Sequence, residues 1–248
     1  MSSLFLSDTG PLWSEQGLRS FGRRGAKAIA QHLLPRSVAV WRGSEARRAG
    51  LGGLRYGWGA KTRAPGRVAL TFDDGPAPLT NEYLRVLAAL DARATFFLVG
   101  EMCVEYPELV RAIAVQGHEV AGHGYTHRRF TSLTRAELEA ELWRTAAVLP
   151  PTPAANKLVR PPYGAVSLAT LATCVRHGFT SVMWSLNSGD WREHNPRDVA
   201  NTFVEAVAPG EIVLLHEGQS WTLDALPTII ENLRKCGHEL VTVSELLD

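Results

Sequence analysis

The sequence predicts an α/β fold with about seven parallel strands closed into a (β/α) barrel, and three observations lead to this prediction. Short runs rich in β-branched and aromatic residues alternate with helical stretches from residue 67 onward. The runs are almost continuously apolar, which is typical of parallel strands buried on both faces. Polar residues repeatedly follow the strands, and the carboxyl ends of parallel barrel strands meet at one rim. So many contributions to one rim favour a barrel over an open sheet.

Seven runs are predicted to be strands, at residues 67–72, 94–99, 119–121, 157–160, 180–185, 211–216 and 239–243. The helices between them carry apolar residues three and four positions apart. One helix is expected to begin after Thr134, because Glu137 follows three residues later in the pattern of a capping box. Two later helices are expected to begin near Pro196 and within residues 222–227.

The chain divides near residue 66 into a basic segment and an acidic body. Residues 1–66 carry 11 Lys/Arg against 3 Asp/Glu, whereas the rest of the chain carries 15 against 22. We interpret residues 1–66 as a basic N-terminal extension that packs on the barrel. A basic amphipathic helix at 13–34 that contacts a membrane surface is the less favoured alternative. Residues 37–41 are expected to add a peripheral strand.

The composition narrows the class of protein. A net charge of +1 gives no reason to expect a nucleic-acid partner. The three cysteines are too few and too scattered for a disulfide scaffold, which fits a reducing compartment. No stretch has the apolar length of a secretory signal or a membrane span. We therefore expect a cytoplasmic protein, and the sequence leaves its oligomeric state open.

Two motifs supply a candidate metal site. Asp73 and Asp74 end the first predicted strand, where one carboxylate can bind a metal while its neighbour stays free to accept a proton. His123 and His127 follow the third strand four residues apart, a spacing that places two imidazoles on one face of a helical turn. Two imidazoles and one carboxylate form a normal zinc site with a position left for water. Each motif alone is also compatible with an ordinary turn or an accidental histidine pair.

Three further strand ends carry groups suited to acid–base chemistry. Arg160 precedes two prolines that stiffen the backbone, so it could pair with a rim carboxylate while the next loop directs N–H groups at an oxyanion. A surface arginine before an ordinary turn is the alternative. Asp190 follows the fifth strand and His216 ends the sixth. A carboxylate close to that imidazole would keep it protonated and able to donate a proton.

Together these motifs resemble the polysaccharide deacetylase family, the carbohydrate esterases of family 4 that contain a NodB-homology domain. The resemblance covers about residues 66–247 and places all five family motifs. The run Thr-Phe-Asp-Asp-Gly-Pro at 71–76 is highly specific, and Arg-Pro-Pro-Tyr-Gly at 160–164 is nearly as specific. The resemblance implies a distorted (β/α) barrel of the NodB-homology type, with residues 67–248 as the catalytic domain.

The resemblance also implies one divalent metal ion, usually Zn²⁺, with Co²⁺, Ni²⁺ or Mn²⁺ as alternatives. The metal ligands would be Asp74, His123 and His127. The catalytic groups would be Asp73 as general base, Arg160 orienting Asp73, the backbone N–H of Tyr163 at the oxyanion, and His216 as general acid tuned by Asp190. Leu214, Trp191 and Tyr163 would contact the substrate, the first two by lining the pocket for the acyl methyl group.

Two positions depart from the family pattern. The family usually has Ser or Thr after the first metal histidine, and this chain has Gly124. The hydroxyl that would steady the loop between His123 and His127, the metal loop, is therefore missing. This puts in doubt how the two imidazoles are held in place. Asn187 stands where the family often has an additional acid, so a secondary role is in doubt while Asp190 remains.

The leading hypothesis is a metal-dependent hydrolase of non-peptide carbon–nitrogen bonds that removes acetate from an N-acetylated amino sugar or oligosaccharide. The alternative keeps the fold and the motifs but changes the substrate, to a cyclic amide or ureide or to an acylated natural-product intermediate. A third hypothesis is an inactive carbohydrate-binding or structural module. That hypothesis predicts the loss of at least one catalytic group or metal ligand, and all of them are present.

Overall fold

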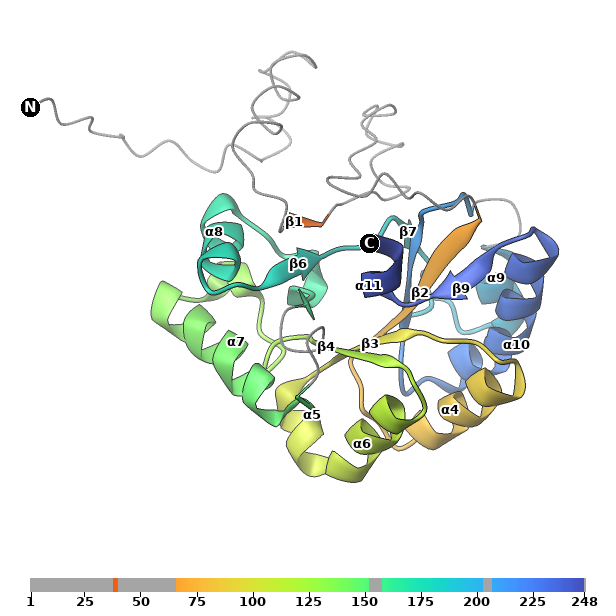
Figure 1. Ribbon diagram of the computed structural model, residues 1–248, viewed down its shortest axis with the longest axis horizontal. Coiled ribbons are helices and arrows are strands. Elements are labelled where there is room, and N and C mark those ends of the chain that lie inside the picture. Colours follow the sequence, from red (N-terminus) through yellow and green to blue (C-terminus); the bar gives the residue numbers. More distant parts are fainter. Residues whose placement is uncertain (1–37, 40–65, 152–157, 203–206, 248) are drawn as a thin grey trace, which may run out of the picture.

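The computed structural model describes residues 38–39, 66–151, 158–202 and 207–247, which form one parallel sheet with helices outside it (Figure 1). The strands are β1 (Val38–Ala39), β2 (Arg67–Asp73), β3 (Thr95–Leu98), β4 (Glu119–Gly122), β5 (Leu158–Val159), β6 (Thr180–Val182), β7 (Leu186–Asn187), β8 (Ile212–His216) and β9 (Glu239–Val241). The main helices are α4 (Thr80–Ala89), α5 (Gly100–Glu105), α6 (Pro107–Val115), α7 (Arg135–Val148), α8 (Leu168–Arg176), α9 (Pro196–Asn201), α10 (Ser220–Lys235) and α11 (Val243–Leu247), with 3-10 turns at η1 (Phe130–Ser132) and η2 (Pro162–Gly164).

Each predicted strand is present, and several helix starts agree with the sequence signals. The capping box at Thr134 opens α7, and α9 begins at Pro196. α10 begins at Ser220, slightly before the expected position, and runs through Pro227. β1 lies within the predicted peripheral strand and pairs with β6. The predicted helix at 13–34 and the packing of the rest of residues 1–65 lie outside the described residues.

The strand order is β1-β6-β5-β4-β3-β2-β8-β7, with β9 also paired to β2. β6 pairs with β5, and β7 pairs with β8. Because β6 and β7 follow each other along the chain, residues 180–187 connect β6, next to β1 at one side of the order, to β7 at the other end, which gives a distorted barrel. The predicted barrel is therefore confirmed.

The predicted strand at 180–185 is wrong in one respect, because the chain leaves the sheet between β6 and β7. Arg160, inside the barrel, donates to the carbonyls of Val182 and Met183 at 3.3 Å each. These carbonyls are the acceptors that a continuous strand would offer to its neighbour. A buried guanidinium thus replaces sheet pairing where the barrel closes.

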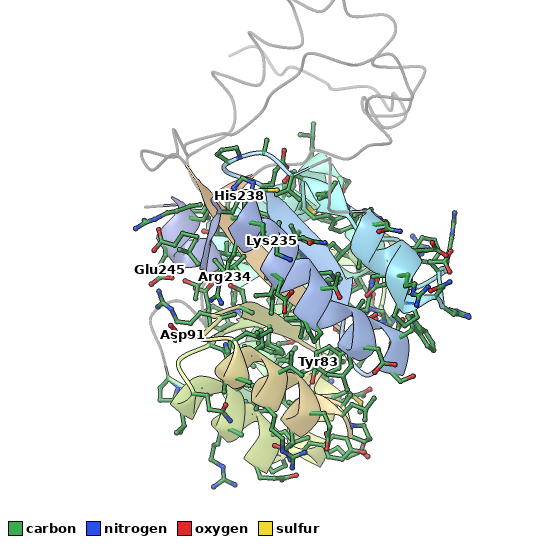
Figure 2. The ribbon with its side chains drawn as sticks, turned by 90° about the vertical axis from the view of Figure 1, so that its right-hand side faces the viewer. Tyr83, Asp91, Arg234, Lys235, His238 and Glu245 are labelled. Atoms are coloured by element: carbon green, nitrogen blue, oxygen red, sulfur yellow. The ribbon has the colours of Figure 1, made fainter. Side chains whose placement is uncertain are left out.

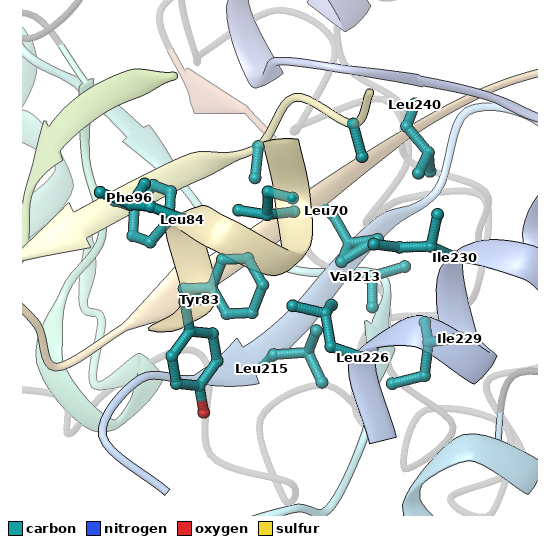
Figure 3. Packing of buried hydrophobic residues seen from close by; sticks show 14 of the residues in the cluster. Leu70, Tyr83, Leu84, Phe96, Val213, Leu215, Leu226, Ile229, Ile230 and Leu240 are labelled. Atoms are coloured by element: carbon teal, nitrogen blue, oxygen red, sulfur yellow. The ribbon is translucent and has the colours of Figure 1, made fainter. Parts of the chain in front are cut away.

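The two faces of β2 have different neighbours. Alternate residues point in opposite directions, so Leu70 and Phe72 face the helices while Thr71 and Asp73 face the barrel interior. Figure 3 shows the outer packing, in which Leu70 and Tyr83 lie among leucines and isoleucines of α10 and the neighbouring strands. The apolar outer face anchors β2, and the inner face is free to carry polar groups toward the rim.

The barrel interior has its own smaller core at the end opposite the rim. It contains Ala69, Phe97, Ala121, Leu158, Val182, Ile212, Val241, Val243 and Leu246. The last two come from α11, which therefore closes the amino-terminal end of the barrel in the centre of Figure 1. With that end filled by apolar side chains, polar groups inside the barrel are concentrated toward the carboxyl ends of the strands.

α10 and α4 lie next to each other on the outer surface, as Figure 2 shows. Arg234 near the end of α10 donates to the carbonyl of Asp91, just after α4, at 2.8 Å. At the start of α10, Tyr83 donates to the carbonyl of Gln219 at 2.7 Å. The Tyr83 bond fixes the first turn of α10, which follows His216 at the rim, and the Arg234 bond holds the last turn of α10 beside α4. In the part of the chain that is described, none of the helices has the length and apolar character needed to cross a membrane.

Candidate metal centre and catalytic groups

Asp73 and Asp74 leave the end of β2 in different directions, as the sequence predicts. Asp73 is almost fully buried and faces the barrel interior, next to His216 of β8 in the sheet register. Asp74 has a φ of 74°, in the left-handed region, and its side chain is 42% exposed. This reversal of the backbone aims Asp74 across the rim, so the two carboxylates serve separate positions.

His123 and His127 both reach the carboxylate of Asp74. Their Nε2 atoms lie 3.4 and 3.1 Å from Asp74 Oδ1. One ligand atom from each of the three residues lies within 4.8 Å of the others, a spacing that fits a single metal ion. The expected helical turn is wrong, because Gly124 and His127 have φ values of 78° and 54°. The imidazoles converge through a left-handed loop.

The imidazole of His123 is oriented by a backbone carbonyl. Its Nδ1 lies 2.7 Å from the carbonyl oxygen of Arg160, which can only accept a hydrogen bond. Nδ1 therefore carries the proton, and the lone pair of Nε2 points toward Asp74. Burial raises the pKa of Asp74, but the neighbouring imidazoles outweigh this and hold it well below its usual range. Two nitrogens and an oxygen in this arrangement fit the donor set of zinc.

Arg160 is fully buried and holds Asp73 in place. Its guanidinium donates to Asp73 Oδ1 at 2.6 Å and to the hydroxyl of Thr71 at 2.8 Å. Thr71 in turn donates to the carbonyl of Val213 at 2.6 Å. The second carboxylate oxygen of Asp73 lies 3.7 Å from His123 Nε2. Thr71 was not among the predicted site residues, although strand alternation places it on the same face as Asp73.

Tyr163 lies beside the candidate metal ligands and has a strained backbone. Its φ is 60°, and its ring lies 4.7 Å from that of His127. Gly164 and Ala165, the next two residues, donate their N–H groups back to Pro161 and Pro162. Among the hydrogen bonds of the described residues, none uses the N–H of Tyr163. The turn therefore leaves that donor available next to the candidate metal centre.

His216 is held by a carboxylate inside the barrel wall. Asp190 is completely buried, and its Oδ1 lies 2.7 Å from His216 Nδ1. Its Oδ2 accepts from the backbone N–H of His216 at 2.7 Å and from the hydroxyl of Thr222 at 2.9 Å. Burial alone would lower the pKa of His216, but the hydrogen bond and charge of Asp190, with the charges of Asp73 and Asp74, raise it overall. Thr222 was not among the predicted site residues, because it lies more than thirty residues from Asp190 along the chain.

The two residues predicted to line an acyl pocket differ in exposure. Leu214 is buried and pairs with Thr71, so it faces the barrel interior below the rim. Trp191 is 44% exposed, with the guanidinium of Arg192 stacked 3.9 Å from the centre of its ring. Asn187, the second departure from the family pattern, accepts a hydrogen bond from the N–H of Gly189 at 2.9 Å. It therefore shapes the turn that leads to Asp190.

Two buried glutamates near the rim were also missed. Glu141 of α7 accepts hydrogen bonds from the metal loop and provides a support that the departure at Gly124 had put in doubt. Its sequence signal is a carboxylate on the apolar stripe of α7, between Leu138 and Leu142. Glu217 follows His216 and accepts from the hydroxyl of Thr80, and burial raises its pKa to about 7.

Comparisons with known proteins show which proteins this chain is similar to. The sequence profile of the family described as polysaccharide deacetylase matches residues 60–182. A peptidoglycan-N-acetylglucosamine deacetylase from Bacillus cereus is 34% identical over 73% of this chain and 87% of its own length. A chitooligosaccharide deacetylase from a Bradyrhizobium species is 34% identical over 77% of this chain and 94% of its own length. A family 4 carbohydrate esterase from Streptomyces lividans, solved with acetate, covers 72% of this chain and 93% of its own, with 34% identity and a TM-score of 0.66.

Proposed function

This chain belongs to the polysaccharide deacetylase family, and we propose that it is a metal-dependent de-N-acetylase that hydrolyses the acetamido group of an N-acetylated sugar and releases acetate. One observation carries the proposal. Asp73 lies between a three-residue metal site on one side and the His216–Asp190 pair on the other. A base, a metal site and an acid at one rim are the groups that hydrolysis of an unactivated amide requires.

We propose Asp74, His123 and His127 as the ligands of one divalent ion, with Zn²⁺ favoured over Co²⁺, Ni²⁺ or Mn²⁺ because two imidazoles and a carboxylate suit zinc. When bound, such an ion polarises the amide carbonyl and acidifies a water molecule. The carbonyl of Arg160 keeps the Nε2 of His123 unprotonated for this purpose. Asp74 extends from the rim toward both imidazoles.

Asp73 is the proposed general base. The bond from Arg160 to Oδ1 fixes the carboxylate, and Oδ2 remains on the side of the metal ligands. From there Oδ2 takes a proton from the water that attacks the carbonyl carbon. The N–H of Tyr163 donates to the oxygen that becomes negatively charged, an interaction that strengthens as the charge develops.

His216 is the proposed general acid. Asp190 accepts from Nδ1, which leaves Nε2 to carry the proton that the departing amine needs. The raised pKa of His216 favours the protonated imidazole. Protonation matters because an amide nitrogen leaves poorly as an anion. Leu214 and Trp191 are proposed to enclose the methyl group of the acetyl moiety.

The buried free thiols of Cys103 and Cys174 suit a reducing compartment, and we propose a cytoplasmic location on that ground. An N-acetylated oligosaccharide or a biosynthetic intermediate would then be the substrate, in contrast to intact cell-wall polymer. Fractionation of cells followed by detection of the native protein tests this location. Recovery in the cytoplasmic fraction would favour the oligosaccharide or intermediate, and recovery with the cell wall would favour the intact polymer.

A substrate panel tests the proposed function. Purified protein supplied with zinc is incubated with N-acetylglucosamine oligomers, soluble peptidoglycan fragments and small cyclic amides, and acetate and free amine are measured. We expect equal amounts of acetate and free amine from at least one N-acetylated sugar. Turnover of a cyclic amide alone, or zinc binding without acetate from any sugar, would contradict the proposal.

A further inference from the structure

The loop between the two metal histidines lies between α5 and α7. On the α5 side, the backbone N–H groups of Gly100 and Glu101 donate to the carbonyls of Gly124 and Tyr125, at 3.0 Å each. On the α7 side, the guanidinium of Arg144 lies 3.7 Å from the centre of the Tyr125 ring. The carbonyls of Gly124 and Tyr125 therefore point toward α5. The N–H groups of Tyr125 and Thr126 point the other way, toward acceptors on α7.

Glu141 of α7 supplies those acceptors. Its Oε2 accepts from the N–H groups of Tyr125 and Thr126, at 2.6 and 2.9 Å. Its Oε1 accepts from the hydroxyl of Thr126 at 2.6 Å. Glu141 is about 5% exposed, so water does not compete freely for these donors. A single carboxylate thus accepts three hydrogen bonds from two adjacent residues of the loop.

We propose that Glu141 is a positioning residue for the metal centre. It does not touch the ligand atoms but fixes the loop that joins His123 to His127, and this inference rests on the metal site of the proposed function. The loop has left-handed φ values at Gly124 and His127, which a free segment would rarely adopt together. Hydrogen bonds to a charged acceptor are the strong class, and three of them converge on this loop.

Space around Gly124 shows how closely Glu141 and the loop fit each other. A Cβ added at Gly124 would lie 3.3 Å from Glu141 Oε2 and equally close to Phe130 and Pro162. A side chain at this position would therefore push against the carboxylate that holds the loop. Glu141 therefore supports a loop that has no side chain at position 124, and the two residues pack closely against each other.

A merely structural role for Glu141 makes a different prediction. If the residue only anchors α7, its loss lowers the unfolding temperature while the folded protein still binds metal as before. If it positions the ligands, its loss weakens metal affinity in the folded protein, because the spacing of His123 and His127 is no longer fixed. The contact of Arg144 with Tyr125 remains in either case and continues to join α7 to the loop.

The test compares Glu141→Leu with Glu139→Leu. Glu139 lies on the same helix but pairs with Arg135 and His177, away from the loop. The dissociation constant for zinc is measured on metal-stripped protein by competition with a chelator, and unfolding is followed without metal. We expect zinc affinity to fall by about 10- to 100-fold in Glu141→Leu, the usual effect of losing an outer support of a metal ligand, and to be unchanged in Glu139→Leu.

Two milder variants decide the question if Glu141→Leu does not fold. Glu141→Gln keeps an oxygen acceptor for the two N–H groups, and Thr126→Val removes only the hydroxyl contact. Each is expected to weaken zinc affinity by about two- to tenfold, the usual effect of one hydrogen bond. With zinc in excess, acetate release by these variants should return close to that of the unaltered protein.

The outcomes separate this inference from the proposed function. Zinc affinities equal to that of the unaltered protein in every loop variant that folds would overturn the positioning role, even if unfolding temperatures fell. Failure of the unaltered protein itself to bind zinc would instead overturn the proposed function. Weaker zinc binding that tracks the loss of contacts, with Glu139→Leu unaffected, would support both.

Discussion

The rim holds two clusters of histidine and carboxylate that differ in geometry although they use the same residue types. In the first, Asp74 lies between the Nε2 atoms of His123 and His127 and is substantially exposed. In the second, the buried carboxylate of Asp190 is bonded to Nδ1 of the single imidazole of His216. The first cluster brings one ligand atom from each of its three residues close together. In the second cluster, the bond at Nδ1 leaves Nε2 of His216 free to carry one proton.

The supports of the two carboxylates explain this difference. Each oxygen of Asp190 accepts two hydrogen bonds, from Ser188 and His216 on one side and from His216 and Thr222 on the other. Among the described residues, the ion-pair partners of Asp74 Oδ1 are the two imidazoles, an arrangement that suits a shared cation. The number and direction of the imidazole nitrogens, more than the residue types, separate a metal site from an acid.

The largest expected effect comes from removing a metal ligand. His127→Ala should abolish stoichiometric zinc binding and lower kcat/KM for acetate release by more than about 100-fold, because losing even an outer support of a ligand costs about 10- to 100-fold. Zinc content and initial rates check this. His177→Ala, which removes an imidazole paired with Glu139, is the matched control. Full zinc content in His127→Ala would show that the first cluster is not a metal site.

Removing the acid should affect turnover without affecting the metal. His216→Gln is expected to lower kcat by about 10²- to 10⁴-fold, the usual contribution of general acid–base catalysis, while zinc content stays the same. Elemental analysis and single-turnover acetate release measure the two quantities. Loss of zinc in this variant would mean that the two clusters are not independent.

The pH dependence of the rate tests whether the His216–Asp190 pair supplies the acid. A raised pKa keeps His216 protonated to higher pH, so the basic limb of kcat/KM should lie above the range of an ordinary imidazole. Asp190→Asn removes the main raising cause and should move that limb to lower pH by about one unit or more. A pH–rate profile for each protein checks the shift. An unmoved basic limb would assign it to another group.

The smallest effect is expected at Gly124, in the first cluster. Gly124→Ser restores the residue type that the family usually has, yet it should lower the free energy of unfolding by about 1–2 kcal/mol, because φ is 78° there. Contact of the new side chain with Glu141 should also weaken zinc binding. Chemical denaturation and zinc competition measure both effects. A gain in stability or zinc affinity would show that the loop relaxes to accept the hydroxyl.

The site residues that could be predicted from the sequence are those at the ends of strands. Asp73, Asp74 and His216 are predictable because parallel strands bring their carboxyl ends together, whatever the exact helix packing. Glu141 and Thr222 could not be placed, because each reaches the site through the packing of its helix, α7 or α10, against the rim. The strand break before Leu186 was also unpredictable, since it depends on the carbonyls that a buried Arg160 binds.

The metal loop shows a further limit of sequence reasoning. The spacing of His123 and His127 predicts convergence, and the convergence is confirmed. The predicted means, a helical turn, is wrong, because a glycine at 124 permits a left-handed path that brings the same two nitrogens together. Spacing alone identified the pair of residues but not the backbone that joins them.

The central claim is that the cluster of Asp74, His123 and His127 binds the ion on which amide hydrolysis depends. The most direct test is a zinc titration of metal-stripped protein, followed by acetate release from N-acetylglucosamine oligomers. We predict no acetate without metal and a rate that rises with zinc to saturate at one ion per chain. Equal rates with and without metal would contradict the claim.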